Sequence, residues 1–141
     1  MNKDYTVDMT NVKSPFDLIK DGTHEARITG VEVKESQAGN TYLNIELTLK
    51  NNQKIWDVAV IGGDNEQAIK FGKWKIKRIF EVGGLKMSNK LKNPHEQMLG
   101  TVVGIIVTTR KDDPTRKQIA DYAVVNNPTM NADPNLSLIH I

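Results

Sequence analysis

The chain has 141 residues, a length that fits one domain with a sizeable hydrophobic core. Its apolar fraction of 38% and charged fraction of 26% are those of an ordinary globular protein and exclude wholesale disorder. It contains no cysteine, which excludes disulfides, thiolate nucleophiles and cysteine-ligated zinc. The net charge is only +2, no apolar run is long enough to span a bilayer, and the first ten residues lack the layout of a signal peptide. We expect a cytoplasmic protein without membrane contact.

Three strand-like segments joined by short turns occupy residues 23–61. In the first segment the apolar positions alternate but change phase beside Gly30, which predicts a β-bulge. Turns are predicted at residues 37–40 and 51–53, which are rich in Gly, Asn and Gln. A bent first strand in a three-strand meander predicts a sheet that curls toward a barrel.

A lysine-rich helix is predicted after the third strand. Asp64 is its expected N-cap, and Gly83-Gly84 is expected to end it. Its apolar positions recur at helical spacing and predict a buried face flanked by Phe71 and Phe80; they are Ala68, Gly72, Ile76, Ile79 and Gly83. Residues 70–92 hold eight Lys and Arg against one Glu, a local charge of +7. Such a patch favours a polyanionic partner, with a solvated lysine-rich surface as the equal alternative.

The remaining elements complete a five-stranded pattern. Residues 85–97 predict a polar loop with room for one short strand, and residues 99–109 predict a fourth strand with a bend at Gly104. A hairpin turn at 111–114 leads to a fifth strand at 118–125. This order predicts a mainly β fold, the five-stranded OB-fold, which is a Greek-key barrel with one helix between strands 3 and 4.

The domain is expected to span residues 14–125, with the apolar Phe16, Leu18 and Ile19 packed on the barrel. Residues 1–13 are polar and patternless, which predicts a flexible arm. Residues 126–141 predict a disordered or non-native tail. Its apolar end, from residue 136 onward, could instead add an edge strand or dock on a neighbouring subunit.

Several short motifs are distributed along residues 15–122. They are Pro15-Phe16 followed by Asp21-Gly22, Glu35 to Asn40 leading into Tyr42-Leu43, Lys54-Ile55-Trp56-Asp57, Asn65 to Ala68, Phe80 to Gly84, and Leu99-Gly100. Together they resemble a family of small phage-encoded proteins catalogued as a domain of unknown function and associated with single-stranded DNA binding through an OB-fold. The resemblance implies a role in phage DNA replication or recombination, with phage or host replication proteins as further partners.

Single-strand binding needs aromatic faces for unpaired bases and basic groups for phosphates. Tyr42 lies on the polar face of the second strand, and Trp56 lies on the neighbouring strand, close enough for the two to share a stacking platform. Because Val58 and Val60 share the face of Trp56, a buried core tryptophan is the equal alternative. Trp74, off the apolar stripe of the helix, is expected to pack against lysine stems more than to stack on a base.

Six cations are best placed by strand parity or loop position to contact phosphates, although a solvated surface charge is the default for each. They are Arg27, Lys34, Lys50, Lys54, Arg110 and Lys111.

The sequence gives little indication of a metal site or a catalytic site. The three histidines, His24, His95 and His140, follow no metal-ligand spacing, and no serine lies in an elbow motif. We expect no enzyme activity, cofactor or metal. The predicted function is single-stranded DNA binding with little sequence preference, with a homodimer as one possible state. The alternative is a phage structural or assembly module that uses the barrel for protein contacts; a small-ligand barrel would need a deep pocket that the sequence does not indicate.

Overall fold

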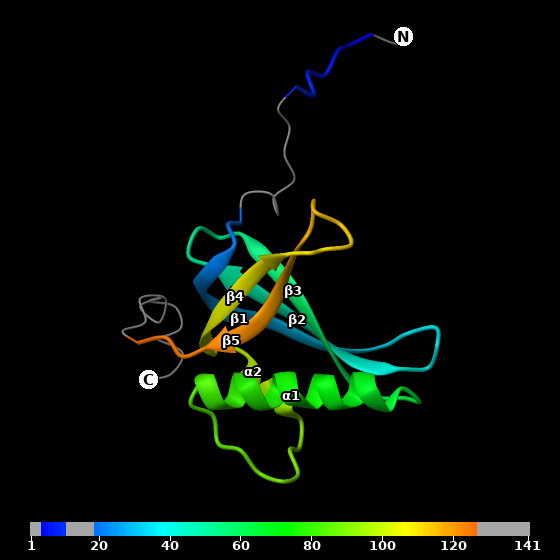
Figure 1. Ribbon diagram of the computed structural model, residues 1–141, viewed down its shortest axis with the longest axis vertical. Coiled ribbons are helices and arrows are strands. Elements are labelled where there is room, and N and C mark those ends of the chain that lie inside the picture. Colours follow the sequence, from blue (N-terminus) through cyan, green and yellow to red (C-terminus); the bar gives the residue numbers. More distant parts are fainter. Residues whose placement is uncertain (1–3, 11–18, 127–141) are drawn as a thin grey trace.

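The computed structural model describes residues 4–10 and 19–126 (Figure 1). Its elements in chain order are β1 (Gly22–Glu35), β2 (Thr41–Leu49), β3 (Lys54–Gly62), α1 (Glu66–Val82), α2 (Pro94–Met98), β4 (Val102–Thr109) and β5 (Lys117–Ala123). Residues 4–10 are exposed and belong to no helix or strand. The rest of the predicted arm, most of the apolar clip at 14–18 and nearly all of the predicted tail lie outside the described residues.

The five strands form one antiparallel sheet in the order β3-β2-β1-β4-β5. β1 is central because residues 22–27 pair with β4 and residues 26–35 pair with β2. Its register against β2 shifts between Ile28 and Gly30, so the β-bulge predicted beside Gly30 is confirmed. The bend lets one strand serve both halves of the sheet, which curls into the half-barrel seen in Figure 1.

The core lies inside this curl. Alternate residues of the strands point inward, and β2 follows the predicted alternation from Leu43 to Leu49. Ile19, the described end of the apolar clip, is also buried, as predicted. The largest fully buried side chains are Tyr122, Phe80, Ile19, Ile28, Leu43, Ile45, Leu47, Ile79, Met98, Ile105, Val103 and Val107.

Helix α1 runs across one end of the curled sheet and packs mainly on β3 (Figure 1). Gly72 permits the close approach, because a Cβ at this position would overlap the backbone carbonyl oxygen of Val60. The predicted N-cap, Asp64, is wrong by one residue: the side chain of Asn65 accepts the hydrogen bond from the Ala68 amide at 3.0 Å. The helix ends at Gly83, as predicted.

A buried polar cluster joins the two edge strands to α1. The carboxylate of Asp57 on β3 accepts hydrogen bonds from the Tyr122 hydroxyl on β5 and from the Lys75 ammonium on α1, each at 2.7 Å. Burial, followed by the Asp57 charge, raises the pKa of the Tyr122 phenol well above its usual range. Arg78 adds a second tie from α1 to β5 through Asp121, with Nε 3.1 Å from the carboxylate. The open side of the curl is thereby closed by side chains.

Two predictions for the second half of the chain were wrong. The loop at 85–97 holds the short helix α2, which starts at Pro94 where a missing amide costs nothing, and no strand. Gly104 is not a bend, since the register of β4 against β5 shifts between Ile106 and Val107. Gly104 instead allows close pairing, because a Cβ there would lie 2.9 Å from the Ala123 carbonyl oxygen.

The ends of the last two strands also differ from prediction. β4 begins at Val102 rather than at residue 99, after the left-handed Gly100 and a hydrogen bond from the Thr101 amide to the Met98 carbonyl. β5 ends at Ala123 rather than at residue 125.

Candidate functional site

The outer face of β2 and β3 carries the residues that the sequence singled out. Because side chains alternate along a strand, Tyr42 on β2 and Trp56 on β3 both point away from the core. The inward positions of β3 are Ile55, Asp57 and Ala59, which are buried. Trp56 is 42% exposed and Val58 43% exposed, so the alternative of a core tryptophan is wrong. A large aromatic side chain and an aliphatic neighbour therefore face outward on an open sheet surface.

Tyr42 and Trp56 share this face but do not touch across the hairpin. Tyr42 pairs with Val60, whereas Trp56 pairs with Glu46. One further pair on this face, Asn44 with Val58, lies between them, so the backbone positions of the two aromatic residues are about 13 Å apart along the strands. The expectation of a single shared platform is therefore corrected: the rings are far enough apart to serve different bases.

A polar cluster occupies the centre of the face, beside Trp56. The Thr29 hydroxyl donates to a Glu46 carboxylate oxygen at 2.7 Å and lies 2.8 Å from the Thr48 hydroxyl. The Lys54 ammonium lies 3.3 Å from the same carboxylate. The Thr29 hydrogen bond, with a smaller contribution from Lys54, holds the pKa of Glu46 below its usual value. Glu46 is thus an anion in the middle of the candidate surface.

Most of the predicted phosphate-binding cations have acidic neighbours. Lys34 lies 3.5 Å from Glu32, Lys50 lies 3.6 Å from Glu25, and Lys54 pairs with Glu46. Each of these three lysine side chains is nevertheless about half exposed to solvent.

The positions of the six cations divide them into groups. Lys34 lies beside Tyr42, since the two residues are a cross-strand pair. Arg27 is half-buried on β1 opposite Thr48, at the other end of the outer face. Lys54 is two residues from Trp56 on the same face of β3. Lys50 follows β2, in the turn to β3.

Arg110 and Lys111 lie apart from this group, in the loop between β4 and β5. Arg110 makes a two-pronged ion pair with Asp112, at 2.6 and 3.0 Å, which lowers the pKa of that carboxyl. Lys111 is exposed and forms no ion pair with any residue that the structure describes. The loop is the predicted hairpin, and its base is closed by the hydrogen bond from the Arg110 amide to the Arg116 carbonyl.

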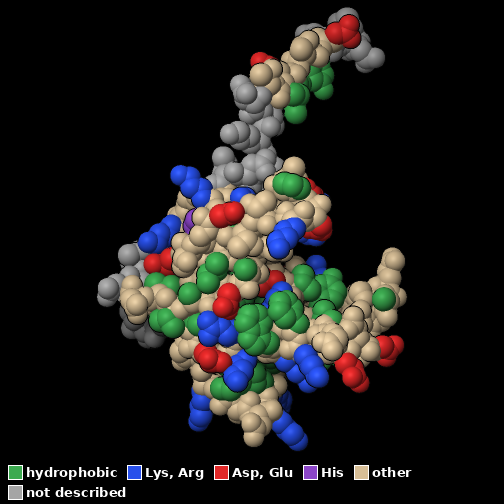
Figure 2. All heavy atoms as spheres, in the orientation of Figure 1, with side chains coloured by type: hydrophobic (Ala, Val, Ile, Leu, Met, Phe, Trp, Pro, Cys, Tyr) green, Lys and Arg blue, Asp and Glu red, His purple; other side chains and the backbone are tan. Residues whose placement is uncertain are grey.

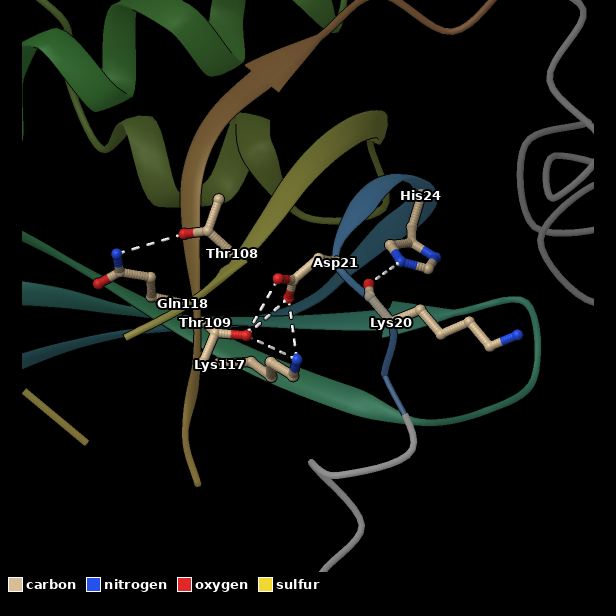
Figure 3. A network of polar contacts seen from close by, with 7 residues as sticks. All are labelled: Lys20, Asp21, His24, Thr108, Thr109, Lys117 and Gln118. Atoms are coloured by element: carbon tan, nitrogen blue, oxygen red, sulfur yellow. Dashed lines mark hydrogen bonds and ion pairs between the residues drawn. The ribbon is translucent and has the colours of Figure 1, made fainter. Parts of the chain in front are cut away.

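A polar network fixes the base of that hairpin to the start of β1 (Figure 3). Asp21 accepts hydrogen bonds from the Thr109 hydroxyl at 3.0 Å and from the Lys117 ammonium at 2.9 Å. The Lys117 contact lowers the pKa of Asp21. Nearby, His24 Nε2 lies 2.6 Å from the Lys20 carbonyl oxygen, which gives this histidine a local structural contact. The loop with Arg110 and Lys111 therefore projects from a fixed base.

A further surface feature is an aromatic pair on α1, which the sequence pattern did not favour as a site. The Phe71 and Trp74 rings are stacked, with centroids 5.4 Å apart and planes 18° apart. Phe71, which was expected to flank the buried stripe, is 55% exposed, and Trp74 is 38% exposed. The signal in the sequence was the spacing of three residues between two aromatic side chains in a run of lysines, which places both on one side of a helix.

Within residues 4–10 and 19–126, no group of three or more His, Cys, Asp or Glu side chains is arranged to hold a metal ion. In the same part of the chain, no helix has the length and apolar character needed to cross a membrane.

Comparison with protein-family models places the chain in a described family. A family model with the description "Protein of unknown function (DUF669)" matches residues 5–135. No match was found among curated proteins.

Proposed function

The chain belongs to the DUF669 family of proteins of unknown function, and we propose that it binds single-stranded DNA with little sequence preference. The observation that carries the proposal is the outer face of β2 and β3, where Trp56 is exposed and Tyr42 lies on the same surface. An exposed indole on an open sheet is suited to stacking on an unpaired base, which every base permits through its π-face.

The proposal includes an OB-fold. It is supported by the strand order and by the central β1, which pairs with both β2 and β4. Contact between β3 and β5, together with α1 across the end of the sheet, also fits this fold. In OB-folds the face of strands 2 and 3 and the loops after strands 1 and 4 bind oligonucleotides. Tyr42, Trp56, Arg110 and Lys111 lie on those elements here.

Phosphate binding would use the cations around this face. The ion pairs of Lys34, Lys50 and Lys54 involve half-exposed lysines, and such surface pairs are worth only about 0–1 kcal/mol. Exchange of a carboxylate partner for a phosphate therefore costs little. Each phosphate contact releases counterions from the nucleic acid, so affinity should fall steeply as salt rises.

The resemblance to phage proteins extends the proposal to the biological role. We place the protein in phage DNA replication or recombination, in the cytoplasm of the host cell, where single strands are exposed. Phage or host replication proteins would be its further partners, and a homodimer is compatible with the role.

The decisive experiment uses one tryptophan as the reporter. The chain has two tryptophans, so Trp74→Phe leaves Trp56 as the only indole. Titration with oligo-dT should quench its fluorescence, whereas a duplex of equal length should not, and the quenching should weaken with salt. Addition of Tyr42→Ala should lower the affinity by about 1–3 kcal/mol. If neither fluorescence nor the anisotropy of a labelled oligo-dT changes at low salt, the proposed function is wrong.

A second candidate function is an assembly module for a phage structure. It is favoured by the exposed apolar side chains Trp56 and Val58, since such surface often marks protein contacts. That function predicts concentration-dependent association in sedimentation experiments, together with no salt-sensitive affinity for oligo-dT.

A further inference from the structure

The aromatic pair on α1 has the geometry of a supported stacking surface. The Lys75 ammonium lies 4.9 Å from the centroid of the Phe71 ring, and Phe71 in turn stacks on Trp74. Phe71 thus contacts both a cation and the indole; Phe71 is 55% exposed and Trp74 is 38% exposed, so both rings keep surface open to solvent. The indole is held in place and has surface left for another planar group.

This pair adjoins the outer face of β3. Lys75 connects them, because its ammonium also donates to the Val58 carbonyl at 2.9 Å. Gly72 brings the helix backbone against Val60, one turn of the helix before Lys75. Figure 2 shows hydrophobic side chains in a band across the middle of this side of the molecule, interspersed with Lys and Arg. The Lys75 contact therefore joins α1 to β3 at Val58, two residues after Trp56.

The charges on the two surfaces differ. On the barrel, Lys34, Lys50 and Lys54 have carboxylate neighbours within 4 Å. On α1, Lys70 lies four residues before Trp74 and Lys77 three residues after it, on the same side of the helix. These two lysines and Lys73, next to Trp74 in the chain, make no ion pair with any described residue. Positive charge without compensation is thus concentrated beside Trp74. A polyanion gains most where no carboxylate must be displaced.

We propose that the bound single strand continues from the outer face of β3 across α1, where Trp74 stacks on a base and Lys70, Lys73 and Lys77 contact its phosphates. Phe71 is a positioning residue that supports the indole. This inference rests on the proposed single-strand binding and deepens it, since it makes the footprint longer than the sheet face alone. A protein partner for the same patch is less consistent with the lysines around it, because interface cores are depleted in charge.

Two single-tryptophan proteins separate this inference from the proposed function. Trp74→Phe reports on the sheet face through Trp56, and Trp56→Phe reports on α1 through Trp74. Each is titrated with oligo-dT of about 6 and about 16 nucleotides, because the binding-site size of an OB-fold lies between about 4 and about 16 nucleotides. The expected result is that both lengths quench Trp56, whereas only the longer one quenches Trp74.

Affinity measurements give the second readout. In Trp74→Leu, affinity for the longer oligo-dT should fall about 5-fold or more, with affinity for the shorter one unchanged. Phe71→Leu should have a smaller effect in the same direction. Lys70→Gln should reduce the slope of log K against log salt by about 0.7 for the longer oligo-dT. The matched control is Lys20→Gln, which removes an exposed lysine distant in sequence from α1 and should leave that slope unchanged.

The outcomes are distinct. Quenching of Trp56 but not Trp74 by the longer oligo-dT, with unchanged affinity in Trp74→Leu, overturns the α1 path and leaves the proposed function standing. Absence of binding in every protein overturns both. Quenching of Trp74 alone overturns the sheet face as the site and, with it, the path that continues from β3 to α1. If Trp74→Leu alters only the sedimentation of the protein, the patch is a contact between copies of the chain and the inference is wrong.

Discussion

Glu46 is an acidic side chain in the middle of the proposed binding surface, opposite Trp56. Its carboxylate would repel phosphates and also occupies Lys54 at 3.3 Å. We expect Glu46→Gln to bind oligo-dT about 3- to 5-fold more tightly, since a unit charge about 4 Å away is worth about 1 kcal/mol in water. The amide of glutamine can still accept the Thr29 hydrogen bond, so the fold should be unaffected. Anisotropy of labelled oligo-dT measures the change.

Glu96→Gln is the matched control for this prediction, because it removes the same charge from an exposed position on α2. Its affinity for oligo-dT should equal that of the wild type at moderate salt. Weaker binding by Glu46→Gln would mean that the carboxylate positions a ligand group rather than repelling it, and equal gains in both variants would show only a general effect of net charge.

The residue whose environment was hardest to predict is Trp56. Strand β3 is apolar on both faces, with Ile55 and Ala59 inward and Trp56 and Val58 outward. Periodicity shows that the two sets lie on opposite faces but cannot tell which one is the core. Tyr42 was simpler, because β2 alternates between apolar and polar residues. The inward face of β3 is decided by the curl of the sheet, which encloses Ile55 and Ala59 in the core.

At the scale of single elements, the two neighbouring residues Asp64 and Asn65 differ in their importance as N-cap of α1. The Asn65 side chain accepts the Ala68 amide at 3.0 Å and so satisfies one free donor of the first turn. Asn65→Ala should lower the free energy of unfolding by about 1 kcal/mol, as for other lost caps. Asp64→Ala, in the residue that the sequence pattern favoured as N-cap, should cost less than half as much. Urea denaturation of the two variants checks the assignment, which a larger loss in Asp64→Ala would contradict.

The contact between α1 and β3 depends on Gly72. A Cβ there would overlap the carbonyl oxygen of Val60, and the backbone nitrogen of the same residue would lie 2.6 Å away. Because backbone atoms cannot rotate aside, Gly72→Ala must push the helix outward. Overpacking of this kind costs about 1–3 kcal/mol, which thermal or urea denaturation will measure.

Gly62→Ala is the matched control for Gly72→Ala. A Cβ at residue 62 would meet only the Thr41 side chain, at an ordinary 3.5 Å. We expect its free energy of unfolding to stay within about 0.5 kcal/mol of the wild type. A loss as large as that of Gly72→Ala would mean that any substituted glycine in this region is destabilising, so that close helix packing is not the cause.

For the molecule as a whole, the parts of the fold that depend on local patterns were predictable. Periodicity and turn residues predict the meander, the bulge beside Gly30, the long helix and the order of the elements along the chain. The closure of the curl was not, because it joins Asp57 to Tyr122, which are 65 residues apart. A carboxylate in an apolar strand carries no sequence signal for its distant partners. Stacking of Trp74 on a base was ranked below packing against lysine stems for the same reason, since β3 and the helix adjoin only after folding.

The buried cluster of Asp57, Tyr122 and Lys75 should make the free energy of unfolding depend on pH. In Tyr122→Phe the buried Asp57 carboxylate loses one donor, which should cost about 2 kcal/mol near neutral pH. In the wild type, burial raises the pKa of Tyr122, so the folded state keeps its proton at a pH where the unfolded phenol, with a pKa of about 10, has lost it. The contribution of the hydroxyl is therefore complete below about pH 10 and is lost as pH rises further.

The difference in unfolding free energy between wild type and Tyr122→Phe should consequently shrink above pH 10, by up to about 1.4 kcal/mol per pH unit. Comparing the two proteins removes the titration of the lysines, which both retain. Urea denaturation at about pH 8 and about pH 11 measures the difference. A difference that stayed constant between these pH values would show that folding does not raise the pKa of the phenol, and the absence of any difference at about pH 8 would show that the hydroxyl does not contribute to the closure.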